Sequence, residues 1–106
     1  PDHNPTDDMG IFAPFYGRPA LTGTLISSLS RKNSAPVLTA AVIRTKEGFR
    51  VYYREVLDQD SSDPLIAATA LNKALEETIA IAPDQFQWVY PRFKKRLDIN
   101  EKSPYR

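Results

Sequence analysis

Apolar and polar positions along the 106-residue chain predict strands and helices in turn. A short apolar run at residues 11–16 lies between two glycines and favours a strand. Pro14 restricts that strand to a sheet edge, because proline cannot donate a ladder hydrogen bond. An apolar residue at every fourth position then predicts a helix over residues 20–31, with Pro19 at its first position. The residues of this apolar stripe are Leu21, Leu25 and Leu29.

Two further strands and a second helix follow. Residues 35–43 show no polar alternation, which is typical of a strand buried on both faces. Residues 49–57 alternate between apolar and polar, which indicates a half-exposed strand antiparallel to the one before it. Asp63 as N-cap and Pro64 in the first turn predict the start of a helix that Pro83 ends. Its apolar face is formed by Leu65, Ala68, Leu71, Leu75 and Ile79.

The order strand, helix, strand, strand, helix predicts an α/β fold with three strands in one small sheet. Two helices cannot easily cover both faces of that sheet. We therefore interpret the chain as part of a larger mixed-sheet domain, whose remainder packs where the sheet edge is exposed. After the second helix, residues 84–106 form a C-terminal arm that is first aromatic and then basic. Residues 97–106 are expected to be a flexible tail.

Composition excludes several classes of function. Hydrophobic residues make up 42% of the chain and charged residues 25%, which argues for a folded domain rather than a disordered segment. A formal net charge of +1 argues against binding to nucleic acid through bulk charge. The lack of cysteine excludes disulfides and thiolate chemistry, and a single histidine argues against a histidine metal cluster. No apolar run approaches the roughly 20 residues that span a bilayer, and no signal peptide is visible.

One histidine carries the first candidate chemistry. His3 and Asp8 have the spacing H-x4-D. In glycerolipid-type acyltransferases that spacing lets the imidazole take the proton of an acceptor hydroxyl while the carboxylate orients the ring. Any histidine near several acids matches it, and no apolar strand precedes His3, so we interpret His3 as a solvated loop residue. Asp2, Asp7 and Asp8 lack the spacing of a cation-binding loop and are also interpreted as solvated.

The C-terminal arm offers a second candidate, because its aromatic residues interleave with four cations. These residues are Phe86, Trp88, Tyr90, Arg92, Phe93, Lys94, Lys95 and Arg96. Such a segment could bind an RNA strand through stacking and charge, or lie on an anionic membrane. Alternatively, its rings pack on the sheet and its charges are solvated. The arm by itself leaves these three interpretations open.

Two motifs are similar to those of a known family. Asp2-His3, followed by G-I-F-A-P-F-Y-G-R-P-A-L-T at residues 10–22, resembles a block of the bacterial lipid A biosynthesis acyltransferases, the lauroyl/myristoyl transferase family. P-D-Q-F-Q-W at residues 83–88, followed by R-F-K-K-R at residues 92–96, resembles the C-terminal signature of that family. The resemblance covers nearly the whole chain as far as this basic segment. The positions that depart from the family pattern are Tyr16, Tyr90, Pro91 and Leu97.

The resemblance implies that residues 1–106 are the C-terminal portion of a single acyltransferase domain. The catalytic H-x4-D/E motif and the membrane anchor of the family would lie upstream, so the isolated chain is expected to be inactive. The implied reaction moves a fatty acyl chain from acyl carrier protein to a hydroxyl of a lipid A precursor, at the cytoplasmic face of the inner membrane. No metal or redox cofactor is implied, and nucleic acid is not expected as a partner.

Two alternatives to this function remain open. One is an acyltransferase of the same superfamily that uses another glycolipid or lipid acceptor. The other is a small module that binds nucleic acid or an anionic surface through Trp88 and the cations of residues 92–96. Such a module would bind as a stable monomer, with an affinity that falls steeply with salt.

The resemblance also implies roles for individual residues. Asp2 matches an aspartate near the active site of the family and is expected to play a supporting catalytic role. Thr22, at the start of the predicted first helix, is expected to hydrogen-bond a phosphate, since backbone N–H groups favour anions there. Arg92, Lys94 and Arg96 match the signature cations. They are expected to pair either with lipid A phosphates or with internal carboxylates that tie the arm down.

Overall fold

A computed structural model describes residues 3–105 of the chain and contains both helices and strands. The strands are β1 (Gly10–Phe15), β2 (Arg18–Gly23), β3 (Leu38–Thr45) and β4 (Gly48–Glu55). The helices are α1 (Leu25–Lys32) and α2 (Pro64–Ile79), with short 3-10 turns at Asp7–Met9 and Pro83–Gln85. The predicted α/β class is confirmed. The described residues, however, form four strands in two separate two-stranded sheets, where one three-stranded sheet was expected.

The first sheet is a hairpin of β1 and β2, whose last paired residues are Phe15 and Arg18. Its turn consists of Tyr16 and Gly17, which both have positive φ angles of 49° and 76°. Two such residues in succession suit the tight turns that reverse a twisted hairpin. The prediction of a helix from residue 20 is therefore wrong at its start, because this turn sends residues 18–23 back along β1 as a strand.

The leucine stripe of the predicted first helix is divided between two elements. Leu21 is buried on β2, whereas Leu25 and Leu29 lie on α1 and are exposed. The stripe therefore has the period of a helix without being the buried face of one. The end of the helix follows the prediction, with Arg31 and Lys32 in the last turn, where cations complement the helix dipole.

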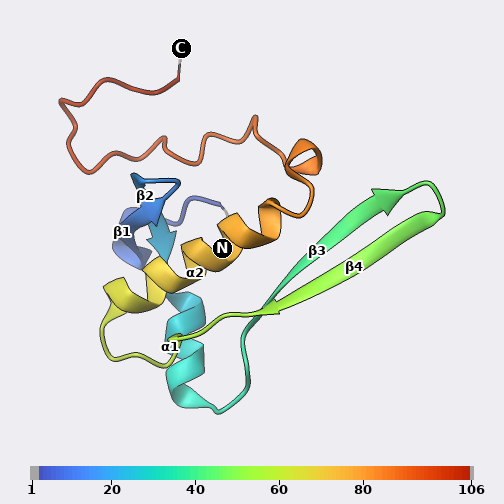
Figure 1. The fold of residues 1–106 in the computed structure, drawn as a ribbon. Helices are drawn as coiled ribbons and strands as arrows, with labels where there is room; N and C mark the ends of the chain where they lie inside the picture. Colours follow the sequence, from blue (N-terminus) through green and yellow to red (C-terminus); the bar gives the residue numbers. More distant parts are fainter. Residues whose placement is uncertain (1–2, 106) are drawn as a thin grey trace.

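The second sheet is an antiparallel hairpin of β3 and β4, as the pattern predicted. Figure 1 shows this hairpin extending away from the rest of the molecule. The prediction that residues 35–43 are buried on both faces is wrong for this structure. Leu38 and Val42 are exposed, and only Thr39 of β3 is buried. No layer of the described chain covers the face to which Leu38 and Val42 belong.

Helix α2 begins as predicted and joins the two hairpins. Asp63 caps it by accepting a hydrogen bond from the Leu65 backbone N–H at 2.9 Å, and Pro64 is in the first turn. The helix ends at Ile79, before the predicted Pro83 boundary. One side of α2 packs with Phe15 and Ala20 of the first hairpin, through Ile79. A second cluster consists of Val56, Leu71 and Ala74.

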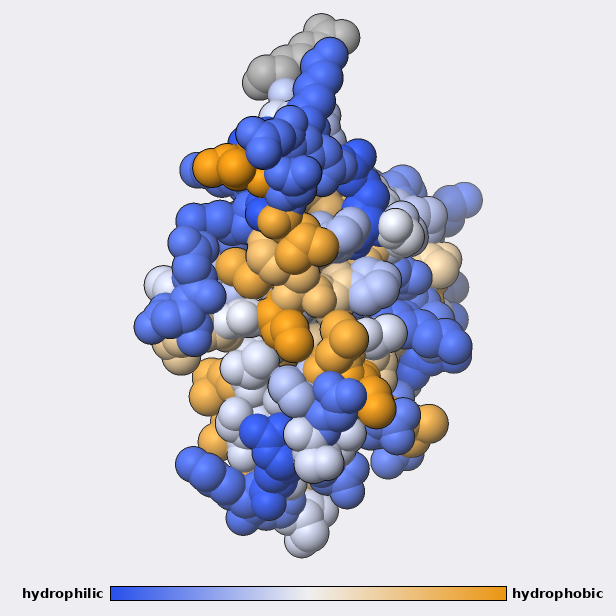
Figure 2. Space-filling view, turned by 90° about the vertical axis from the view of Figure 1, so that its left-hand side faces the viewer, coloured by the Kyte–Doolittle hydropathy of each residue, from blue (hydrophilic) through white to orange (hydrophobic). Residues whose placement is uncertain are grey.

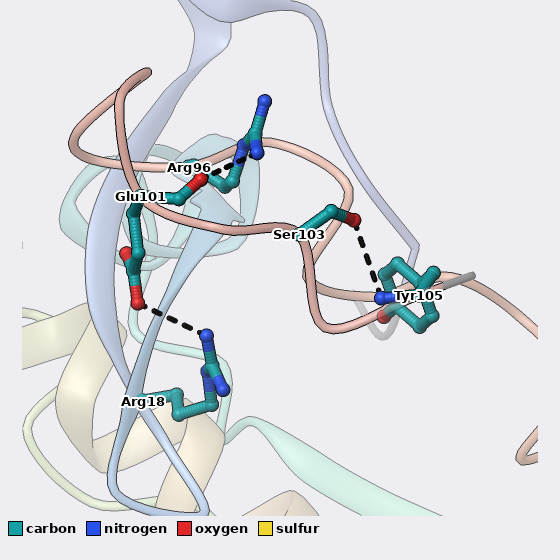
Figure 3. Close-up of polar contacts among 5 residues, drawn as sticks. All are labelled: Arg18, Arg96, Glu101, Ser103 and Tyr105. Atoms are coloured by element: carbon teal, nitrogen blue, oxygen red, sulfur yellow. Dashed lines mark hydrogen bonds and ion pairs between the residues drawn. The ribbon is translucent and has the colours of Figure 1, made fainter.

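The C-terminal arm contains no strand or helix beyond Pro83–Gln85 in its described part, and it runs past α2 and the β1–β2 hairpin (Figure 1). Three contacts fix its last stretch. The Glu101 carboxylate pairs with Arg18 at 3.0 Å, and the Glu101 carbonyl accepts a bond from Arg96 at 2.6 Å (Figure 3). The Tyr105 hydroxyl accepts a bond from the Phe93 N–H at 2.8 Å. The expectation that residues 97–106 form a flexible tail remains a prediction.

Replacing Asp63 with alanine removes the acceptor that caps α2. We expect the free energy of unfolding to fall by about 1 kcal/mol, as for other lost N-caps. Urea unfolding followed by circular dichroism measures this change. Ser62→Ala, at the neighbouring exposed position, is the control, and an equal loss in both variants would contradict the capping role.

Candidate functional site

Arg92, the first cation of the basic segment, is buried inside the fold. Its guanidinium donates hydrogen bonds to the Leu21 carbonyl at 2.6 Å and to the Thr22 hydroxyl at 3.1 Å. It also lies over the Phe15 ring, 5.5 Å from the ring centroid. Arg92 as a whole residue is 6% exposed. These contacts with a backbone carbonyl and a side-chain hydroxyl attach the arm to β2.

Thr22 lies in the interior of β2 and not at the start of a helix. It is fully buried, and its hydroxyl donates to the Ala20 carbonyl at 3.0 Å. The same oxygen accepts bonds from Arg92 and from the Asn72 side-chain amide, the latter at 2.9 Å. The expected placement of Thr22 at a helix N-terminus is therefore wrong, because the Tyr16-Gly17 turn makes residues 18–23 a strand. Its hydroxyl is engaged by protein groups.

Asn72 is a buried polar residue that the sequence reasoning missed. It is 0% exposed on α2, and its amide nitrogen bonds to Thr22 and, at 3.5 Å, to the Ala13 carbonyl. Its side-chain oxygen is buried and has no hydrogen-bond donor among residues 3–105. Thr22, Asn72 and Arg92, here called the polar network, thus join β2, α2 and the arm. One signal was present, because Asn72 is a polar residue in the apolar stripe of the helix, four positions after Ala68.

The N-terminal segment is attached to the arm close to this network. The Asn4 backbone N–H donates to the Tyr90 hydroxyl at 2.8 Å, and the Asn4 amide donates to the Pro91 carbonyl at 2.9 Å. The His3 ring stacks on Tyr90, with centroids 4.3 Å apart. Asp8 is exposed in the turn Asp7–Met9. Asp2 lies outside the described residues, next to His3 in the sequence.

A cavity of about 400 Å³ lies beside β1, β2 and the basic segment. It is lined by Asp7, Phe12, Leu21, Lys94, Lys95, Arg96 and Ile99, and is here called the cationic cavity. The Lys95 ammonium pairs with the Asp7 carboxylate at 3.0 Å, and Arg96 bonds to a backbone carbonyl. The Lys94 ammonium forms no ion pair with any residue from 3 to 105. Cations beside apolar side chains suit a ligand that is anionic at one end and apolar at the other.

Tyr16 stands where the resembled motif has phenylalanine. Burial raises the pKa of its phenol above the ordinary value of 10.0, and the nearby Glu76 carboxylate raises it further. The Tyr16 backbone N–H also donates to that carboxylate, at 2.5 Å. The centroid of the Tyr16 ring lies 4.8 Å from that of Phe15 and 6.0 Å from that of Trp88. The phenol is therefore neutral at physiological pH, and adds no charge to this side of the hairpin.

The described surface has further features that bear on function. Figure 2 shows hydrophobic atoms running down the middle of one face, with hydrophilic atoms on both sides. Neither helix described here is long and apolar enough to cross a bilayer. No group of three or more acidic or histidine side chains within residues 3–105 comes together as metal ligands.

Comparison with known sequences identifies the family. The sequence model of the bacterial lipid A biosynthesis acyltransferases matches residues 1–95, which is most of the chain. This chain belongs to that family. The resemblance of the two sequence motifs is thereby confirmed, and the matched residues include both the hairpin motif and nearly all of the basic segment.

Curated relatives are acyltransferases of lipid A biosynthesis. The palmitoleoyltransferase of Escherichia coli (strain K12) is 35% identical over 99 residues, which are 89% of this chain and 31% of the relative. A lipid A biosynthesis acyltransferase of Shigella flexneri matches to the same extent. The E. coli lauroyltransferase is 29% identical over 100 residues, covering 91% of this chain and 33% of that enzyme. The chain thus spans about a third of the length of the relatives it matches.

Replacing Arg92 with methionine keeps an apolar stem over Phe15 and removes the guanidinium from the polar network. We expect the free energy of unfolding to fall by roughly 2–3 kcal/mol, because a buried charge-assisted donor is lost and its acceptors stay buried. Lys94→Met makes the same replacement at an exposed position and is expected to change stability by less than about 0.5 kcal/mol. Urea unfolding of both variants measures the difference. Equal effects would show that Arg92 does not hold the arm.

Proposed function

We propose that this chain forms the C-terminal part of an acyltransferase that moves a fatty acyl chain from acyl carrier protein to a hydroxyl of a lipid A precursor. Membership in the lipid A biosynthesis acyltransferase family supports the reaction class. A match to about a third of each relative supports the idea that the chain supplies one portion of the enzyme. The enzyme would work at the cytoplasmic face of the inner membrane.

The cationic cavity is the observation that carries the choice of substrate. A lipid A precursor combines phosphate groups with apolar acyl chains. Lys94 and Arg96 would pair with a phosphate, since charge-assisted hydrogen bonds to phosphate are strong. Phe12, Leu21 and Ile99 would contact the apolar part of the same molecule. In this proposal Arg92 and Thr22 hold the cavity wall in place from behind, because both are buried.

The chemical step would depend on residues outside this chain. A histidine of an upstream H-x4-D/E motif would remove the proton of the acceptor hydroxyl, whose oxygen then attacks the thioester carbonyl of the acyl donor. The thiol of the carrier would leave after taking up a proton. Asp2 would support this site by orienting a catalytic or substrate-binding group. The anchoring of Asn4 to Tyr90 and Pro91 would keep the adjoining segment beside the arm.

Substituting both Lys94 and Arg96 with glutamine tests the cavity. Binding of a phosphorylated lipid A precursor to the chain is expected to weaken roughly a hundredfold, about tenfold for each lost phosphate contact, equal to ~1.4 kcal/mol each. Equilibrium binding in detergent at low salt measures it. Lys102→Gln removes an exposed cation outside the cavity and is expected to leave affinity unchanged. Equal affinity of the double variant for the dephosphorylated and phosphorylated lipids is also expected, and a retained preference for phosphate would contradict the assignment.

The isolated chain is expected to show no acyl transfer from acyl carrier protein, because its reacting histidine lies elsewhere. Activity is expected when the chain is co-expressed with the two thirds of the E. coli palmitoleoyltransferase that it does not match. Transfer of radiolabelled acyl chain to the lipid precursor is the measurement. Acyl transfer by the isolated chain that His3→Ala abolishes would overturn this proposal, and would assign catalysis to His3 and Asp8.

A further inference from the structure

The two faces of the β3–β4 hairpin have different surroundings. The inner face meets α2, where the Thr39 and Thr78 hydroxyls are 2.7 Å apart and Arg54 pairs with Glu77 at 2.8 Å. Residues at the alternate positions point the other way and form the outer face, because side chains alternate along a strand. The opposed pairs of the outer face are Leu38 with Glu55, Ala40 with Tyr53, Val42 with Val51, and Arg44 with Phe49.

The outer face is apolar and exposed. Its large apolar side chains are Leu38 (54% exposed), Val42 (61%), Phe49 (72%), Val51 (47%) and Tyr53 (69%). Five such side chains on one side of two strands make a continuous patch, and patches of this kind mark interaction sites. The sequence also indicates that this face is covered, since residues 35–43 have the pattern of a strand buried on both faces. A two-stranded hairpin is also marginally stable by itself in water.

The edges of the hairpin indicate what kind of occupant fits. No strand among residues 3–105 pairs with the far side of β3 or of β4. On β3, the Gln85 side chain bonds to both the Arg44 N–H at 2.8 Å and the Arg44 carbonyl at 3.1 Å, as a neighbouring strand would. Backbone groups of this kind need hydrogen-bonding partners when they are buried, and lipid tails supply none. A polypeptide supplies both apolar side chains and backbone partners.

We propose that the outer face of the β3–β4 hairpin is the docking surface for the remaining two thirds of the acyltransferase. That remainder would cover the outer face and add strands at the free edges of the hairpin. This inference rests on the proposed function, because the remainder is defined by the relatives. Those relatives are about three times as long as the segment that this chain matches. Their unmatched length is therefore ample to supply the missing layer, and a second copy of this chain is not needed for it.

A charge pair across the hairpin tests the proposal without weakening the hairpin. Val42→Lys combined with Val51→Glu places opposite charges at directly opposed positions, where such pairs favour strand pairing. The same pair in an apolar interface would be buried at a large cost. Val89→Glu combined with Leu97→Lys is the matched control, since it introduces the same charges at exposed apolar positions of the arm. Tyr53→Lys is a second, single variant of the outer face.

The measurement is co-purification. The full 106-residue chain is tagged and co-expressed with the unmatched two thirds of the E. coli palmitoleoyltransferase. Wild type and the arm control are expected to retain this partner, whereas both outer-face variants are expected to retain on the order of tenfold less, because a buried charge opposes docking. Circular dichroism melting of each isolated chain is expected to give the same midpoint. The loss of the partner then arises from the interface rather than from unfolding.

Other outcomes overturn the proposal. Equal retention by all variants, or retention by none of them, removes the outer face as the docking surface. Sedimentation that shows a dimer of the isolated chain, abolished by the Val42/Val51 charge pair, assigns the face to a second copy. Binding to anionic vesicles that the same pair abolishes assigns it to a membrane. A complex that forms through the outer face yet transfers no acyl chain leaves the docking intact and removes the proposed function.

Discussion

The burial of the Arg92 guanidinium is the constraint on which the rest of this fold depends. A charged group removed from water must find hydrogen-bond acceptors in the protein, since the loss of its hydration is otherwise not offset. Arg92 finds them in the Leu21 carbonyl and the Thr22 hydroxyl of β2. The arm therefore has to cross the β1–β2 hairpin at one place. Asn72 fixes the same hydroxyl from α2, so three elements distant in sequence share one oxygen atom.

Around that point the chain builds two hairpins on one helix. The first hairpin is covered by α2 and by the arm, and its Phe15 and Ala20 are fully packed. The second hairpin touches α2 on only one face and leaves the other open. The two hairpins therefore differ in what they present to their surroundings. The covered β1–β2 hairpin lies beside the cationic cavity, and the β3–β4 hairpin presents an exposed apolar face.

Sequence patterns predicted the elements whose signals are local. Asp63 and Pro64 fix the start of α2 because capping needs only the next few residues, and β3 pairs with β4 across the two-residue turn of Lys46 and Glu47. The helix over residues 20–31 was mispredicted in its first turn, because the left-handed turn before it decides the direction of the chain. No layer of the described chain covers the outer face of β3, so the apolar pattern of that strand did not match its surroundings.

The candidate site was less accessible from sequence than the fold class. The basic segment was recognisable by its motif, but the motif did not distinguish a buried Arg92 from an exposed Lys94. That distinction depends on the crossing of the arm over β2, which brings together residues 70 positions apart. Asn72 went unnoticed because a single polar residue in an apolar stripe has no meaning until its neighbours across the interface are known.

The ion pair of Lys95 with Asp7 gives the cationic cavity an internal counter-ion. Asp7 thereby neutralises one of the three cations that line the cavity, and Lys94 and Arg96 keep their charge for an entering anion. A phosphate, with up to two negative charges, would balance these two remaining cations, whereas a fatty acid with one negative charge would balance only one of them. In the proposed function, the Lys95–Asp7 pair would therefore match the charge of the cavity to a phosphorylated lipid rather than to a free fatty acid.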